Sequence, residues 1–300
     1  MRLSKVGEFR LIERVTRGLP RGPDLRVGVG DDAAVVRVPG PNDLLITTDM
    51  LVEGRHFRRD WSTLREIGQK ALLVNVSDIA AMGGRPRYAV VACGLPPKLS
   101  LRSARDLFGG IRTAARRAGL FLVGGDTNRS NRLILSLTVV GEVEEGRGLL
   151  RSGARVGDAI YVSGRLGRGG MNLKGHKIYL PPIRVSLGRA LLKRKLARSC
   201  IDLSDGLLAD LRHILEASGV GAEVQVEEIP GKAPLPLKLT GGEDYELLFT
   251  ASRRARVPRK IGGVPLTRIG RIIPGVGKIR LIGRGGRPLP LPKRMGYTHF

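Results

Sequence analysis

Segments typical of β-strands alternate with segments typical of helices along the whole chain, and this order constrains the fold most strongly. Apolar, β-branched runs such as Leu44 to Thr48 and Leu133 to Val143 are separated by stretches with helical periodicity. One such stretch is Thr63 to Ala81, which Ser62 or Thr63 begins as a cap and Gly83-Gly84 ends. A second predicted helix covers Leu101 to Ala118, introduced by Pro96-Pro97 and Ser100, and Phe121 to Val123 is expected to be a short buried strand. Strands and helices mixed over the full length predict an α/β or α+β protein.

The chain is long enough for two domains. A protein of 300 residues can form two units of ordinary size, each with a core that needs no disulfide or structural metal. Near the middle, Glu144, Glu145, Gly146 and Gly148 interrupt the pattern as a linker would. We therefore expect one domain over residues 1–145 and a second over residues 146–300.

Composition argues against several classes of protein. Hydrophobic residues make up 42% and charged residues 26%, as in soluble globular proteins, and no window approaches the roughly 18 apolar residues of a membrane span. Glu8, Arg10 and Glu13 interrupt the stretch where a signal peptide would be apolar, so we expect a cytoplasmic location without a membrane partner. Cys93 and Cys200 match no metal or redox spacing and are predicted to be buried apolar residues.

The net charge of +25 raises the possibility of nucleic-acid binding, because basic chains bind phosphate backbones. The basic residues are spread from Arg2 to Arg294 without a basic tail, and only 4% of the residues are aromatic and able to stack on bases. This distribution favours an arginine-rich solvated surface. A nucleic-acid-binding protein remains the alternative from a different functional class.

Acidic residues occur in five clusters beside glycine or hydroxyl residues, where we expect strands to end or helices to begin. The clusters are Gly30-Asp31-Asp32, Thr47-Thr48-Asp49, Gly124-Gly125-Asp126-Thr127, Asp202-Leu203-Ser204-Asp205-Gly206 and Gly241-Gly242-Glu243-Asp244. In addition, Asn75 and Asp78 share one face of a predicted helix. Carboxylate and hydroxyl oxygens suit Mg²⁺, while glycines and helix N-termini suit phosphate groups. Together the clusters predict magnesium-dependent phosphate chemistry.

Each cluster alone also has a structural explanation. Ser204 or Asp205 fits a helix cap, Asp31-Asp32 a turn, and Gly241-Gly242 a hairpin corner. For one cluster the two explanations are about equally good, but five clusters in one basic chain favour phosphate chemistry. The sequence contains no P-loop motif and no protein-kinase signature, and Gly28-Val29-Gly30 lacks the third glycine of a dinucleotide fingerprint. Phosphate must therefore be held in another way.

Several short motifs follow one another in order over nearly the whole chain. They are Gly7-Glu8-Phe9, Gly30-Asp31-Asp32-Ala33, Thr48-Asp49-Met50-Leu51-Val52, His56-Phe57, Lys70-Ala71-Leu72, Asn75 to Gly83, Gly124-Gly125-Asp126-Thr127, Arg151-Ser152-Gly153, Ile201 to Leu207, Gly241 to Leu247, Gly296-Tyr297 and His299-Phe300. In this order the motifs resemble the thiamine-monophosphate kinase family, which shares a superfamily with aminoimidazole ribonucleotide synthetase and selenophosphate synthetase.

The resemblance implies a two-domain fold like that of aminoimidazole ribonucleotide synthetase. Its N-terminal domain would have a mixed β-sheet, bind ATP and magnesium and pair in a homodimer; an α/β C-terminal domain would complete the active site. It implies ATP-dependent phosphorylation of thiamine monophosphate to thiamine diphosphate, by direct in-line transfer with several Mg²⁺ ions as cofactors and ATP as co-substrate.

The resemblance also assigns expected roles to individual residues. The expected metal ligands are Asp32, Thr47, Thr48, Asp49, Asp78, Asp126, Asp202 and Asp205. The expected ATP contacts are Gly125, Asp126, Arg151 and Ser204, and the expected contacts to thiamine monophosphate are His56 and Glu243. The acceptor is a phosphate oxygen already ionised at neutral pH, so positioning and charge neutralisation suffice and no catalytic base is assigned.

Without the resemblance, these residues have ordinary explanations. Arg151 would be a surface arginine, His56 a packed or capping histidine, and Glu243 a turn carboxylate. A sister activity of the superfamily, the phosphoryl activation of a formylglycinamidine or of selenide, is a further alternative. Cys93 lies in a predicted strand rather than a flexible N-terminal loop, which disfavours selenide chemistry, and His56 with the run from Gly241 to Leu247 favours the thiamine enzyme.

Two regions match the family less well. Residues 164–184 form a shorter segment than is usual, rich in glycine and basic residues. Arg294 stands about where relatives often place an aromatic residue against the substrate, so Tyr297 or Phe300 is the alternative source of a ring.

Overall fold

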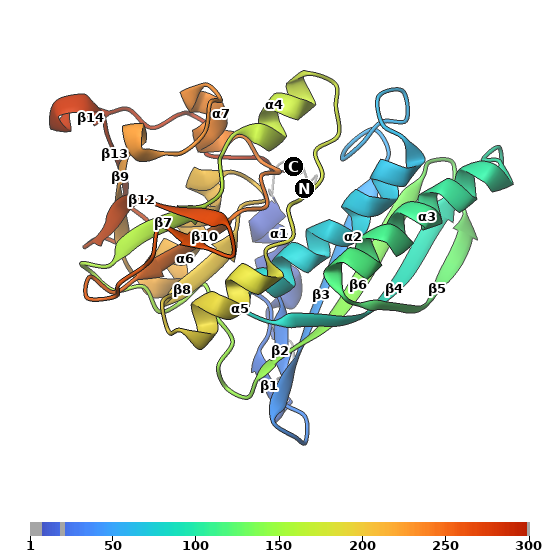
Figure 1. Cartoon of the computed structure of the whole chain (residues 1–300), viewed down its shortest axis with the longest axis horizontal. Helices are drawn as coiled ribbons and strands as arrows, with labels where there is room; N and C mark the ends of the chain where they lie inside the picture. The colour runs from blue at the N-terminus through green and yellow to red at the C-terminus, as the bar shows by residue number, and fades with distance from the viewer. Residues whose placement is uncertain (1–7, 19–21, 299–300) are drawn as a thin grey trace.

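The computed structural model describes residues 8–18 and 22–298 (Figure 1). Gly7, His299 and Phe300, which belong to the expected motifs, lie outside the described residues. The chain forms two α/β units side by side, each with its own sheet, and the N-terminal unit lies on the right in Figure 1. The predicted fold class is confirmed.

The N-terminal unit contains a six-stranded sheet in the order β1-β2-β3-β6-β4-β5. Helix α1 (Glu8–Thr16) precedes it, and the strands are β1 (Leu25–Val27), β2 (Ala34–Val36), β3 (Asn42–Val52), β4 (Arg85–Leu95), β5 (Phe121–Arg129) and β6 (Ile134–Glu144). All neighbouring strands are antiparallel except β4 and β5, whose parallel pairing requires a crossover connection. Helix α3 (Leu101–Ala118) supplies that connection.

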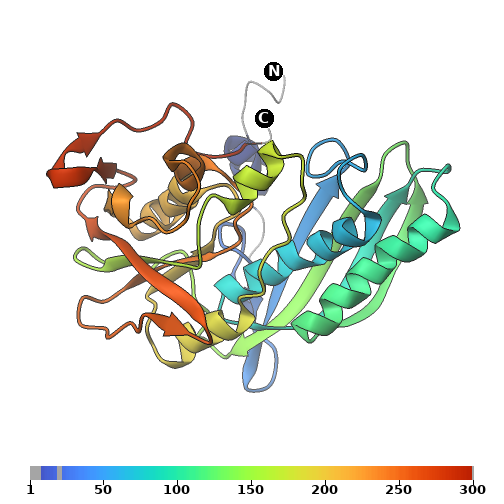
Figure 2. The same cartoon turned by 45° about the horizontal axis from the view of Figure 1, so that its top comes forward.

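Helices α2 (Leu64–Ala81) and α3 cover one face of this sheet, as Figures 1 and 2 show. Helix α2 starts at the predicted cap: the Thr63 side chain accepts from the Glu66 backbone N–H, and the Glu66 carboxylate accepts from the Thr63 N–H. Gly68 lets the two helices approach closely, because a Cβ atom there would lie 2.1 Å from the Leu107 carbonyl oxygen. The predicted extent of α3 is confirmed.

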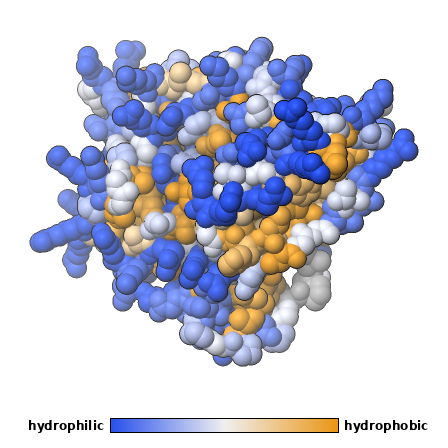
Figure 3. Space-filling model, turned by 45° about the vertical axis from the view of Figure 1, so that its right-hand side comes forward, coloured by the Kyte–Doolittle hydropathy of each residue, from blue (hydrophilic) through white to orange (hydrophobic). Residues whose placement is uncertain are grey.

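The opposite face of the N-terminal sheet is uncovered. Side chains alternate along a strand, so Ile46 and Met50 on β3, Tyr88 and Val90 on β4, and Phe121 on β5 expose apolar surface. With this unit turned forward, Figure 3 shows a broad hydrophobic band on its surface. We call the five side chains the uncovered apolar face.

The C-terminal unit is built on an eight-stranded sheet in the order β14-β13-β9-β12-β7-β10-β8, with β11 paired to β12. Its strands are β7 (Ala159–Ser163), β8 (Ser199–Asp202), β9 (Gly221–Gln225), β10 (Leu247–Ala251), β11 (Lys260–Ile261), β12 (Val264–Ile273), β13 (Ile279–Ile282) and β14 (Pro288–Leu289). Its helices are α4 (Arg168–Lys174), α5 (Val185–Lys193), α6 (Leu207–Ser218) and α7 (Leu235–Thr240).

Two hydrophobic clusters cover the two faces of this sheet. Helix α6 packs on one face through Leu211 and Ile214, while α5 lies on the other and meets Phe249. Helix α5 also packs against α2 of the N-terminal unit, where Gly188 approaches so closely that a Cβ atom would lie 1.9 Å from the Ala80 carbonyl oxygen. The two sheets are therefore joined through a packed helix pair.

Several details differ from the predicted pattern. Phe121 to Val123 was expected to be a short buried strand, but β5 continues to Arg129 and is largely exposed because it forms the sheet edge. Two acidic clusters, Thr47 to Asp49 and Gly124 to Thr127, lie inside β3 and β5 rather than at strand ends, because pairing with β6 and β4 continues past them.

The two cysteines are buried, as expected. Cys93 lies in β4 and Cys200 in β8, and both are buried, which confirms their prediction as core residues. No helix in the described ranges is long and apolar enough to cross a membrane.

Candidate active site

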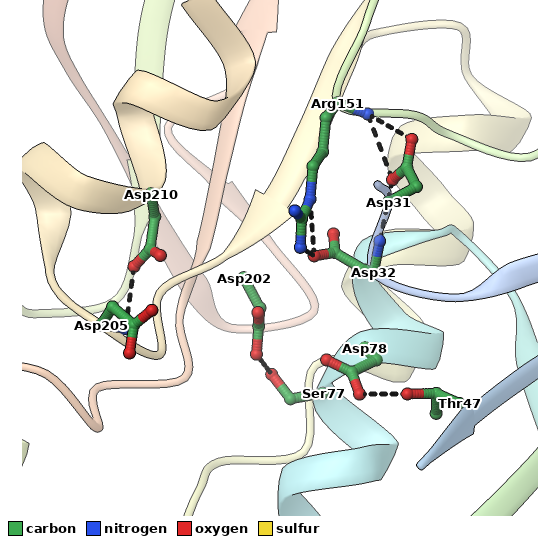
Figure 4. A network of polar contacts seen from close by, with 9 residues as sticks. All are labelled: Asp31, Asp32, Thr47, Ser77, Asp78, Arg151, Asp202, Asp205 and Asp210. Carbon is green, nitrogen blue, oxygen red and sulfur yellow. Dashed lines mark hydrogen bonds and ion pairs between the residues drawn. The ribbon is translucent and has the colours of Figure 1, made fainter. Parts of the chain in front are cut away.

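Three aspartates from distant parts of the chain meet between the two units (Figure 4). Asp32 precedes β2, Asp78 lies in the last turns of α2, and Asp202 ends β8. Each offers one carboxylate oxygen within 4.8 Å of the others. The structure therefore brings together three of the expected metal ligands, two from the N-terminal unit and one from the C-terminal unit.

Hydrogen bonds orient two of these carboxylates. Ser77 Oγ donates to Asp202 Oδ2 at 2.5 Å, and Thr47 Oγ1 donates to Asp78 Oδ2 at 2.6 Å. Asp49 lies on the same face of β3 as Thr47 and shares a side-chain hydrogen bond with Asp78. Thr47 and Asp49 are thus placed beside the three-aspartate cluster, as expected of further ligands.

Burial and mutual repulsion raise the pKa values of these carboxyl groups. Burial raises the pKa of Asp32 to about 8. The negative charge of Asp202 adds to this upward shift, and the positive charge of Arg151 opposes it. Burial likewise raises the pKa of Asp49 and of Asp202 to about 6, and lifts the pKa of Asp78 well above its usual range. A bound cation would offset this repulsion, so the site has the electrostatics of a metal centre.

Arg151 is joined to the cluster. Its guanidinium donates to Asp32 Oδ1 from Nε at 3.1 Å and from a terminal nitrogen at 2.6 Å, and its backbone N–H donates to the Asp31 carboxylate at 3.1 Å. The second oxygen of Asp32 is buried and has no hydrogen-bond partner among the described residues. Arg151 is therefore no isolated surface arginine, and Asp32 keeps one oxygen available for a ligand.

The N-terminus of α6 is organised by Asp210. Its carboxylate accepts from the backbone N–H groups of Asp205, at 3.1 Å, and Gly206, at 3.0 Å. Gly206 holds the cap position with a φ of 122°, so the explanation of Ser204 or Asp205 as the cap is wrong. The Asp205 side chain is left at the site, where burial and the charge of Glu8 raise its pKa to about 6.

A pocket of about 610 Å³ opens beside the cluster. Its lining includes the expected metal ligands Asp49 and Asp205, the expected ATP contact Ser204, and the expected substrate contacts His56 and Glu243. Arg55, Tyr245, Arg294 and Tyr297 line it as well. Tyr297 thus supplies an aromatic ring at the pocket, whereas Phe300 lies outside the described residues.

Thr48, Gly125 and Asp126 lie elsewhere. Thr48 points to the uncovered side of the sheet and donates to the Leu137 carbonyl oxygen at 3.2 Å. Asp126 lies on the edge strand β5, which β6 and β4 separate from β3, and its carboxylate accepts a hydrogen bond from Asn128 at 2.7 Å. Gly125 packs against the Val91 backbone. Within the described part of one chain, Thr48 and Asp126 do not join the three-aspartate cluster.

Three residues at the site had no role predicted from the sequence. Ser77 and Asp210 orient other site residues through hydrogen bonds, and Lys70 forms an ion pair with Glu243. Ser77 and Lys70 stand inside motifs of the family, which was the available signal. Asp210 carried no signal, because an aspartate four residues into a helix usually faces solvent.

Family models and known relatives match most of the chain. The family model for the AIR synthase related protein N-terminal domain matches residues 30–143, and the C-terminal domain model matches residues 155–278. Thiamine-monophosphate kinase of Aquifex aeolicus is 36% identical, covering 100% of both chains, and that of Escherichia coli K12 is 37% identical, covering 98% of both. The chain belongs to the thiamine-monophosphate kinase family.

Solved structures of thiamine-monophosphate kinases share the fold. The structure of AaThiL complexed with AMPPCP and TMP aligns with a TM-score of 0.84 and 34% identity, covering 100% of this chain and 99% of that chain. The hydrogenase maturation protein HypE in complex with ATP aligns with a TM-score of 0.70 at 21% identity, which shows a common fold alone. The predicted family is therefore confirmed.

Proposed function

We propose that this protein is an ATP-dependent kinase that converts thiamine monophosphate to thiamine diphosphate. The observation that carries the proposal is the buried three-aspartate cluster beside a pocket lined by His56 and Glu243. Relatives over the full length are thiamine-monophosphate kinases, and one related structure holds an ATP analogue together with TMP. Membership of this family favours the thiamine substrate over the sister activities of the superfamily.

We extend the proposal to Mg²⁺ as the cofactor. The site offers hard oxygen donors, and the free Oδ2 of Asp32 is an available ligand atom. Asp32, Asp78 and Asp202 would hold ions together with Asp49, Thr47 and Asp205, which lie beside them. When bound, the ions would neutralise negative charge on the phosphate groups.

The residues of the chain would position the two substrates. The guanidinium of Arg151 is planar and suited to phosphate oxygens, and the N-terminus of α6 presents partial positive charge beside Ser204. The pocket with His56 and Glu243 would hold the acceptor with its phosphate toward the cluster. Since that phosphate is already ionised, in-line attack needs orientation rather than a general base.

Incubation with ATP, Mg²⁺ and thiamine monophosphate, followed by separation of the thiamine phosphates, tests the function. We expect thiamine diphosphate from the wild-type protein and at least about a hundredfold less from Asp49→Asn. The matched control is Asp106→Asn, which changes an exposed aspartate on α3 and should keep full activity. Absence of thiamine diphosphate with a folded wild-type protein would contradict the proposal.

The nucleic-acid hypothesis makes the opposite prediction. Binding driven by the net charge of +25 should fall steeply with salt and survive Asp49→Asn.

The proposal also includes a cytoplasmic location and a role for each domain. Residues 1–145 would bind ATP and form the dimer, and residues 146–300 would complete the active site.

We further propose a homodimer that pairs through the uncovered apolar face. Exposed apolar surface of this extent usually marks an interface, and Phe121 is 70% exposed on the edge strand. Thr48 and Asp126 lie on the same side of the sheet, away from the cluster in their own chain. Pairing of two such faces would let Asp126 of one copy serve the site of the other, which would reconcile its position with its expected role.

A further inference from the structure

Lys70 is a buried lysine that holds two residues of the pocket. Its side chain extends from α2 and has no solvent exposure. The ammonium group Nζ donates to the His56 carbonyl oxygen at 3.1 Å and forms an ion pair with Oε1 of Glu243. A buried charge is tolerated only where such partners offset its desolvation, so the location of Lys70 fixes the locations of both partners.

Glu243 is constrained at its backbone as well. Its φ of 68° is left-handed, a conformation that non-glycine residues seldom adopt, and Tyr245 has a φ of 50°. The Glu243 backbone N–H donates to the Ser204 carbonyl oxygen at 2.7 Å, which ties this segment to the loop before α6. The surrounding structure therefore holds Glu243 in a strained conformation.

The two carboxylate oxygens of Glu243 differ in their contacts. Oε1 is occupied by Lys70, whereas Oε2 is buried without a hydrogen-bond partner among the described residues. Glu243 lines the pocket, so a donor group of a bound substrate could satisfy Oε2. The ion pair thus selects which oxygen is offered to a ligand.

We propose that Lys70 is a positioning residue for the acceptor substrate. It holds the Glu243 carboxylate so that Oε2 accepts a hydrogen bond from an amino-bearing, cationic heterocycle in the pocket, and its hydrogen bond to the His56 carbonyl oxygen keeps its own ammonium group in place. Lys70 belongs to the N-terminal unit and Glu243 to the C-terminal unit, so the pair also sets the width of the pocket. This inference rests on the proposed function, and it assigns Lys70 no contact with the phosphates.

The charge-removing variant Lys70→Met tests the role through the acceptor alone. We expect the KM for thiamine monophosphate to rise about 10- to 100-fold, because an oriented hydrogen bond to a charged group is lost, and the KM for ATP to stay within about twofold. The matched control is Arg198→Met, which breaks the ion pair of Arg198 with the buried Asp158, at 2.9 Å. That variant should lower the melting temperature without changing either KM.

A second comparison does not depend on Lys70→Met being stable. In Lys70→Met/Glu243→Gln no buried charge of the pair is left unpaired, so this double variant should fold. If Lys70 acts through Glu243, the double variant and Glu243→Gln should share the same raised KM for thiamine monophosphate. A KM that differs between them by more than about threefold would show that Lys70 acts independently, and the proposal would be wrong.

Failure of the inference and failure of the function are distinguishable. A wild-type protein that forms no thiamine diphosphate overturns the proposed function and this inference with it. Wild-type turnover combined with an unchanged acceptor KM in Lys70→Met overturns the inference alone, and leaves the Lys70–Glu243 pair as a contributor to stability.

Discussion

At the scale of single residues, the three-aspartate cluster places three carboxyl groups close together in a small volume. Asp32, Asp78 and Asp202 are gathered within 4.8 Å, and Arg151 donates hydrogen bonds to one of them, Asp32. Like charges this close cannot all ionise in a buried site. A protein without metal must therefore retain protons on this cluster.

Proton retention predicts how stability depends on pH. Burial raises the pKa values of Asp49 and Asp202 to about 6 and that of Asp32 to about 8, above the value near 3.9 of an unfolded aspartate. The folded state binds more protons, so these groups stabilise it most at low pH, and their contribution is lost as the pH rises through about 6 to 8.

Mg²⁺ competes with these protons, so the rise in melting temperature that Mg²⁺ gives over EDTA should be larger near pH 8 than near pH 6. Thermal unfolding at both values, with and without Mg²⁺, measures this difference directly. An equal Mg²⁺-dependent shift at the two pH values would argue against metal binding by the cluster.

At the scale of elements, the N-terminus of α6 depends on one internal residue. Asp210 accepts hydrogen bonds from the backbone N–H groups of Asp205 and Gly206, in place of a side chain at the cap. This arrangement leaves the Ser204 and Asp205 side chains to the pocket, since neither is used to end the helix.

Replacing Asp210 with alanine should destabilise the protein. Asp210→Ala leaves two backbone N–H groups without their acceptor, and we expect the free energy of unfolding to fall by about 2 to 4 kcal/mol. Glu216→Ala is the matched control on the same helix, because its ion pair with Arg212 is exposed and should contribute less than about 1 kcal/mol. Chemical denaturation of both variants makes the comparison, and equal losses would contradict the assigned role of Asp210.

How well an element could be predicted depended on whether its signals are local. Helix α3 was predicted to the residue because Ser100 caps its start and Gly119, with a φ of 72°, ends it. Strand β5 was predicted too short, since Gly124-Gly125 resembles a break and only pairing with β4 extends the strand through it. The short helices α4 and α7 were not predicted, because they form through packing against each other rather than from periodicity.

At the scale of the whole molecule, the uncovered apolar face predicts self-association. Val123 on β5 is 60% exposed and lies in the edge strand beside this face, whereas Val156 is 58% exposed in the C-terminal unit. We expect Val123→Glu to shift the protein from dimer to monomer, since a charge at an apolar interface must be desolvated, and Val156→Glu to leave the dimer intact. Analytical ultracentrifugation reports the masses, and a wild-type monomer would contradict the proposal.

Shared active sites predict complementation between two inactive variants. If Asp126 serves the site of the other copy, a heterodimer of Asp49→Asn and Asp126→Asn contains one site with both aspartates intact. Mixing and reassembling the two variants should then restore about a quarter of the wild-type activity, because half of the dimers are mixed and each has one working site. No recovery from reassembled dimers would place both residues in the site of one chain.

The candidate site was predictable where chemistry could be read from residue type. Aspartates beside glycine and hydroxyl residues indicated phosphate chemistry, and Asp32, Asp78 and Asp202 do meet in the structure. The contribution of Lys70 could not be predicted in this way, because a lysine in a helix is ordinarily exposed and only tertiary packing buries this one beside Glu243.

Because the cluster takes aspartates from both units, it is complete only after both units have folded. Asp32 and Asp78 are made early in synthesis, but Asp202 ends a strand whose partner β10 comes later still. A ribosome-bound chain that has folded only its first sheet still lacks Asp202, the third aspartate of the cluster. If the cluster binds Mg²⁺ as proposed, the complete three-aspartate site forms only after the second sheet has folded, and the ion would not be a template for the first.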